Sequence, residues 1–150
     1  MATQLTMAEL EEGGERELGT SSWVTIEQRQ IDLFAEATGD HQWIHVDAAA
    51  AAQGPFGGTI AHGYLTLSLL PMLMSEVMHV TDAGMGVNYG IERVRFTSPV
   101  PSGSRVRLKA KLLSAERRQN GVLYRIGVEI EIENTERPAL VGEILFLAYG

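Results

Sequence analysis

The stretch "TIAHGYLTLSLLPMLMSEVMHV", residues 59–80, predicts the element around which the rest of the chain folds. It has the pattern of one long helix whose apolar side chains cover more than one face. Those side chains are Leu65, Leu67, Leu69, Leu70, Leu73, Met74 and Val77. Because such a helix must be covered on most sides, we expect it to be buried. Pro71 should kink it or loosen one turn.

The chain after residue 84 is expected to form sheet. Residues 105–112 alternate basic and apolar side chains, which predicts a strand with one face in water. Residues 124–133 alternate again, and Asn120-Gly121 between the two runs predicts a hairpin turn. One buried helix followed by an antiparallel meander predicts an α+β domain whose sheet curls around the helix. The edges of such a sheet favour pairing into a homodimer.

Length and composition limit the class of protein. The chain has 150 residues and a net charge of −7, so we expect one domain over 1–150 with an acidic segment at 1–20, and no nucleic-acid partner. It has no cysteine, which excludes disulfides, thiolate zinc sites and a cysteine nucleophile. The N-terminus lacks the pattern of a signal peptide, and no uninterrupted apolar run is long enough to span a membrane. A cytoplasmic protein is the expectation.

The stretch "GDHQWIHVD", residues 39–47, concentrates two of the four histidines. Gly39 is a natural stop for a helix over the preceding residues. His41 and His45 have the i, i+4 spacing of HExxH zinc sites, but Gln42 stands where that motif has glutamate. A third histidine is also missing nearby, so we expect no metal.

Asp40 and His45 offer a second interpretation, that of an acid–base pair. Their spacing would place them about 140° apart on a helix, but a turn after Gly39 can direct both into one cavity. There they could hold a single water and move protons near neutral pH. The alternative is that Asp40 is a turn residue and His45 packs beside its neighbours. Composition alone favours that alternative.

The wider pattern bears on this choice. "ATGDHQWIHVDAAAA" followed by "GPFGGTIAHGYLTLSLL" resembles the MaoC-like hydratases, the (R)-specific enoyl-CoA hydratases. The resemblance runs from about Trp23 to the C-terminus, although many members have Asn-Pro where this chain has Gln42-Trp43. It implies a dimeric hot-dog fold and hydration of a trans-2-enoyl thioester, or the reverse dehydration. It also implies that Asp40 and His45 hold the catalytic water.

The resemblance extends to the remaining parts of the site. It favours the Gly63 amide as the donor to the thioester oxygen, because first-turn amides are unpaired; the alternative is that Gly63 only eases packing. His62 is expected to be structural. No metal or redox cofactor is implied, and the acyl carrier is coenzyme A or a phosphopantetheine group. Three aromatic side chains are considered for the acyl tunnel: Trp43, Phe56 and Tyr64. Asn88 and Tyr89 are considered for the border of the substrate site. The side chains considered for a basic rim that binds phosphates are Arg93, Arg95, Arg105, Arg107 and Lys109.

Two rivals to a hydratase remain open. A hot-dog thioesterase would direct water at the thioester carbonyl instead of C3. A non-catalytic acyl-CoA-binding domain would bind without turnover, and the intact Asp40–His45 pair argues against it.

Overall fold

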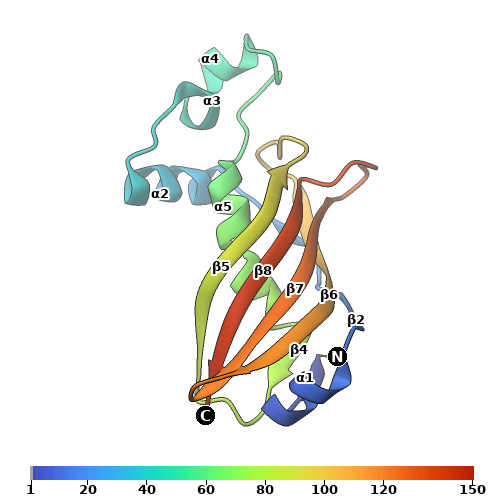
Figure 1. The fold of residues 1–150 in the computed structure, drawn as a ribbon. Coiled ribbons are helices and arrows are strands. Elements are labelled where there is room, and N and C mark those ends of the chain that lie inside the picture. The colour runs from blue at the N-terminus through green and yellow to red at the C-terminus, as the bar shows by residue number, and fades with distance from the viewer. Residues whose placement is uncertain (1) are drawn as a thin grey trace.

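A computed structural model describes residues 2–150 of the chain, and its main layer is a six-stranded sheet. The strands follow the order β2-β6-β7-β8-β5, and β3 also pairs with β6; all of these pairings are antiparallel. Figure 1 shows the sheet curving beside α5, as an α+β fold with a wrapped sheet predicts. The strand bounds are β2 Arg16–Thr20, β3 Val24–Thr25, β5 Met85–Phe96, β6 Arg105–Arg118, β7 Gly121–Ile132 and β8 Leu140–Tyr149.

The β6–β7 hairpin follows the alternation of its sequence. On β7, alternate side chains such as Ile126, Val128 and Ile130 are buried, while the residues between them are partly exposed. Asn120 turns the chain with a φ of 70°, a conformation that asparagine tolerates better than most residues. The predicted hairpin at Asn120-Gly121 is confirmed.

The long helix expected over residues 59–80 is wrong as one element. The structure has α5 at Gly63–Ser68 and α6 at Leu70–Met74, joined through Leu69. Pro71 has no N–H to donate back into the preceding turn, so the break falls where proline predicts it. The expectation of burial holds, since Leu65, Leu70 and Leu73 are buried.

The end of this stretch is a strand. Residues Met78–Val80 form β4, which pairs in parallel with β1 at Thr3–Leu5. His79 therefore lies exposed on a strand, and its expected place in the last turn of a helix is wrong.

Residues 2–20 are folded against the rest of the chain. Besides β1 and β2 they form α1, Met7–Gly13, which Thr6 caps through a hydrogen bond from the Glu9 amide. Leu10 of α1 is only 1% exposed and belongs to the main core. The acidic residues of this segment therefore lie on a folded part of the chain.

Three helices lie beyond one end of the sheet (Figure 1). They are α2 at Gln28–Thr38, α3 at Trp43–Val46 and α4 at Ala48–Ala52. Gly39 ends α2 in the left-handed conformation, with φ 83°, and Asp47 caps α4 by accepting from the Ala50 amide. This region carries the residues of the "GDHQWIHVD" stretch. No helix among residues 2–150 is both long and apolar enough to cross a membrane.

Candidate active site

The turn after α2 brings Asp40 and His45 together. Gly39 reverses the chain, Asp40 follows it directly, and α3 then carries His45 back. Side-chain ligand atoms of Asp40, His45 and His62 all lie within 4.8 Å of one another. Asp40 is exposed, whereas His45 is only 6% exposed. The turn at Gly39 thus brings the two side chains together, as the acid–base interpretation requires.

Backbone carbonyls fix the orientation of His45. Its Nδ1 lies 2.8 Å from the carbonyl oxygen of Ile60, and since a carbonyl can only accept, Nδ1 carries the proton. In the neutral ring, Nε2 then keeps its lone pair. Ile60 is itself held by a 3.0 Å hydrogen bond from its amide to the Ile44 carbonyl. The imidazole is thus oriented as an acceptor at Nε2.

Gln28, at the start of α2, makes two hydrogen bonds to segments that carry or flank the site. Its Nε2 donates to the His45 carbonyl at 2.8 Å, and its Oε1 accepts from the Thr59 hydroxyl at 2.6 Å. One side chain of α2 therefore connects to α3, through His45, and to the segment before α5, through Thr59.

His62 joins this pair, a neighbour that local sequence spacing does not show. Its ring stacks on that of His45, with centroids 3.9 Å apart and planes 24° from parallel. Its Nε2 donates to the Asp40 carbonyl oxygen at 3.0 Å. His62 lies 22 residues from Asp40, so only its place before the helix start in "AHG" hinted that it would return to the site.

The three side chains also form a group of possible metal donors. The third donor, which the sequence stretch lacked, comes from His62. Two imidazoles that share an ion must point their in-plane lone pairs at one position about 2 Å from each nitrogen. Rings that stack only 24° from parallel do not converge in this way. This geometry favours a small hydrogen-bonding molecule at Asp40 and His45 over an ion shared by both rings.

A cavity of about 290 Å³ opens beside His45. It is bordered by Gly63 and Thr66 of α5, and by Phe96 at the end of β5. Of the three aromatic residues considered for the acyl tunnel, Phe56 lines this cavity, whereas Trp43 and Tyr64 are exposed and are not among its lining residues. Thr66 and Phe96 are lining residues that sequence reasoning did not identify.

Gly63 begins α5 at the edge of this cavity. The first amides of a helix have no carbonyl partner within it, so they are available to an acceptor. A Cβ at this position would lie 3.0 Å from Cγ of Phe96. Packing against the Phe96 ring therefore explains why a residue without a side chain stands here. The position of Gly63 is also compatible with an amide donor.

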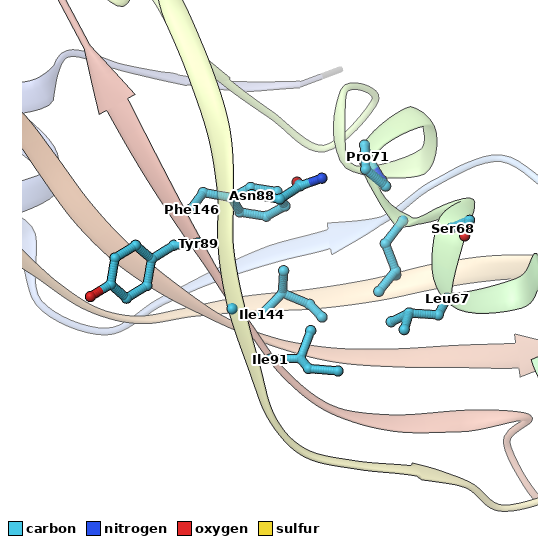
Figure 2. A pocket seen from close by; sticks show the side chains of 10 residues that line it. Leu67, Ser68, Pro71, Asn88, Tyr89, Ile91, Ile144 and Phe146 are labelled. Carbon is cyan, nitrogen blue, oxygen red and sulfur yellow. The ribbon is translucent and has the colours of Figure 1, made fainter. Parts of the chain in front are cut away.

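A larger cavity of about 400 Å³ lies elsewhere, between α5–α6 and β5. Figure 2 shows Leu67, Ile91 and Ile144 around it, and Asn88 and Tyr89 also line it. No carboxylate or imidazole is among its lining residues. Asn88 and Tyr89 therefore border this cavity and not the one beside His45.

The basic residues considered for a phosphate rim fall into two groups. On β6, Arg105 pairs with Glu133 at 2.8 Å and Arg107 with Glu131 at 2.5 Å. Arg93 and Arg95 on β5 make no salt bridge with any carboxylate of residues 2–150. Arg95 is next to Phe96, so this second group is the one closer along the chain to the His45 cavity.

Comparison with known proteins agrees with this arrangement. The family model described as "MaoC like domain" matches residues 11–134, which include the turn, the histidines and most of the sheet. The chain belongs to this family. The expected hot-dog fold is confirmed by the sheet wrapped around α5–α6 together with the structural likenesses below.

Two curated relatives match nearly the whole chain. The 3-hydroxyacyl-thioester dehydratase Z of Mycobacterium tuberculosis (strain ATCC 25618 / H37Rv) is 46% identical over 144 residues, covering 95% of each protein. Nodulation protein N of Rhizobium leguminosarum bv. viciae is 50% identical over 140 residues, covering 91% of this MaoC-like chain and 87% of the relative.

Solved structures share the fold. The R-hydratase PhaJ1 from Pseudomonas aeruginosa aligns with a TM-score of 0.74 and 28% identity, over 97% of this chain and 86% of its own. An (R)-hydratase from A. caviae aligns with a TM-score of 0.71 over 87% and 96%, at 21% identity, and supports the fold alone.

Proposed function

We propose that the protein is a hydro-lyase that adds water to a trans-2-enoyl thioester, giving the (R)-3-hydroxyacyl thioester, or runs the reverse dehydration. One observation carries the proposal: the Asp40 carboxylate and the His45 imidazole have ligand atoms within 4.8 Å of each other, and His45 lines a cavity that Gly63 borders. The names of the dehydratase Z and R-hydratase relatives support the same reaction class.

In the proposed mechanism, Asp40 and His45 hold one water between them. The pair withdraws a proton as the water oxygen bonds to C3, and the C2=C3 π electrons move toward the thioester oxygen. A proton delivered to C2 then completes the 3-hydroxyacyl product. In the dehydration direction the same bonds form and break in reverse.

The Gly63 amide is proposed to stabilise the enolate oxygen that develops in this step. It is placed at the start of α5 on the border of the His45 cavity, where an unpaired N–H can donate to a negative oxygen. A backbone donor needs no reorganisation during the reaction, and removing one such donor typically costs about 10²–10³ in kcat. No metal ion is needed for this chemistry, because the thioester carbonyl already activates C3.

The proposed carrier is coenzyme A. Arg93 and Arg95 support it, because they are guanidinium groups without a carboxylate partner among residues 2–150, on the strand that ends at the cavity. Guanidinium groups bind phosphate well. Replacing Arg95 with alanine should raise KM for crotonyl-CoA and leave KM for a pantetheine thioester unchanged, since the latter lacks the phosphates.

A second copy of the chain is the proposed partner of β5. This strand pairs only with β8 among the described strands, and it exposes Val87, Tyr89 and Ile91. Figure 1 shows it at the edge of the sheet. An exposed apolar edge strand is a template for pairing with another chain, and pairing with its own copy closes the edge in a symmetric dimer.

The reaction itself is tested with crotonyl-CoA. The proposal expects enoyl absorbance to fall while free thiol stays at its starting level, with (R)-3-hydroxybutyryl-CoA as product. Release of free thiol in step with substrate loss would instead assign a thioesterase. Saturable binding without turnover would assign a non-catalytic acyl-CoA-binding domain.

A further inference from the structure

We propose that His62 is a positioning residue that holds Asp40 in register with His45, an inference that rests on the proposed function. The stretch "AHG" places it at the N-cap of α5, where its own side chain makes no capping hydrogen bond. The ring points instead across to the turn after α2. It therefore links the helix that carries Gly63 to the loop that carries Asp40.

The hydrogen bond from His62 is the best-formed one that Asp40 receives. The carbonyl of Asp40 accepts from His62 Nε2 at 3.0 Å. The two other hydrogen bonds of Asp40, its amide to the Thr38 hydroxyl and its Oδ1 from the Gln42 amide, are both 3.4 Å long. Lengths beyond about 3.2 Å mark weak hydrogen bonds. Since Asp40 is exposed, its placement depends chiefly on the contact with His62.

The second contact of His62 is with His45. The His45 and His62 rings stack with centroids 3.9 Å apart. The ring of Phe34 also packs against that of His62, with centroids 4.9 Å apart. His62 is only 2% exposed, so solvent does not reach this stack freely. One imidazole thus touches both members of the proposed acid–base pair, through its edge and through its face.

His62 carries its proton on Nε2 for the same reason that His45 carries its proton on Nδ1: each of these nitrogens faces a backbone carbonyl. A carbonyl accepts at Nε2, so Nε2 carries the hydrogen and Nδ1 of the neutral ring carries a lone pair. This Nδ1 is buried and has no hydrogen-bond partner among residues 2–150. His62 therefore acts on the site as a hydrogen-bond donor through Nε2, and the proton transfers are left to Asp40 and His45.

Two variants separate the edge contact from the face contact. His62→Gln retains a donor near the position of Nε2 and removes the ring, whereas His62→Phe retains a flat ring and removes the donor. If the hydrogen bond to Asp40 is what positions the carboxylate, His62→Phe should lower kcat for crotonyl-CoA by about 10²-fold with KM little changed, because small misplacements cost this much. His62→Gln should stay within about threefold of wild type, and so should His79→Gln, an exposed histidine on β4.

A double-mutant cycle with Asp40→Asn completes the test. When Asp40 is already disabled, His62→Phe should add less than about threefold, since the two residues act as one unit. Thermal unfolding is measured for each chain, and His62→Met replaces His62→Phe if the latter does not fold. Equal loss of kcat in His62→Gln and His62→Phe, unchanged kcat in both, or full additivity with Asp40→Asn would each overturn the inference. If wild type does not hydrate crotonyl-CoA at all, the proposed function itself has failed.

Discussion

Two cavities of this protein, one along β5 and one beside His45, differ in what borders them. The one along β5 is larger, about 400 Å³ against about 290 Å³, yet its border is apolar apart from Ser68, Asn88 and Tyr89. The smaller one has His45 on its border, oriented by the Ile60 carbonyl, with Asp40 and His62 next to it. Placed acid–base groups, and not volume, single out the smaller cavity for chemistry.

The proposed reaction takes place at the cavity beside His45, and the proposed assembly uses the exposed side chains Val87, Tyr89 and Ile91 of β5. Variants in the first region should change kcat and leave the oligomeric state as it is. Variants of these exposed apolar side chains should change assembly first.

The largest effect is expected from the acid–base pair. Asp40→Asn and His45→Ala should each lower kcat for crotonyl-CoA by about 10²–10⁴-fold, the usual size of a lost acid–base group. Both chains should keep the oligomeric state of wild type in sedimentation velocity, and His79→Gln serves as the control. A near wild-type rate in either variant would remove that residue from the mechanism.

The edge strand should respond in the opposite way. Ile91→Lys places a charge on the exposed edge of β5 and should shift the protein from dimer to monomer, weakening association at least about tenfold. Leu33→Lys on α2 is a matched control, because Leu33 and Ile91 are both 53% exposed. Sedimentation at several concentrations gives the result. Dimers that survive Ile91→Lys would place the interface elsewhere.

Adding a methyl group at residue 63 tests how closely the Phe96 ring packs against Gly63. Gly63→Ala would press a Cβ to within 3.0 Å of the Phe96 ring, so unfolding free energy should fall by about 1–3 kcal/mol, as in overpacked cores. Urea unfolding measures this change. Adding Phe96→Leu should recover part of the loss by making room. Stability that stays unchanged in Gly63→Ala would mean that Phe96 moves aside without cost.

The smallest effect concerns Tyr124, which packs against Phe146, a lining residue of the β5 cavity. Burial raises the pKa of the Tyr124 phenol from its usual 10 to about 12. The unfolded chain therefore loses this proton first, so the contribution is constant below pH 10 and stability falls as pH rises from 10 toward 12. The fall should reach about 1.4 kcal/mol by pH 11. Tyr124→Phe should remove that part of the decline in urea unfolding measured from pH 8 to 11. Parallel curves for the two proteins would contradict it.

Local signals predicted the elements that depend on neighbouring residues. The alternation on β6 and β7, the turn at Asn120 and the stop at Gly39 were all present in short windows of sequence. The turn at Gly39 made a meeting of Asp40 and His45 possible, but composition alone favoured a turn residue and a packed histidine. The family resemblance is what implied the pair.

Features that depend on distant partners were not predictable in this way. Residues 78–80 leave the helical pattern because they pair with β1, more than seventy residues earlier in the chain. The folded N-terminal segment depends on the same pairing and on Leu10 in the core. His62 reaches Asp40 only after α5 is packed, so its contact belongs to tertiary structure.

The most direct test of the account is the fate of the water oxygen. Crotonyl-CoA is incubated with wild-type protein in water enriched in oxygen-18, and the product is analysed by mass spectrometry. If Asp40 and His45 direct water to C3, the label appears in the 3-hydroxyl group of an intact thioester, and Asp40→Asn strongly slows its appearance. Label in a free carboxylate, with coenzyme A released, would contradict the account.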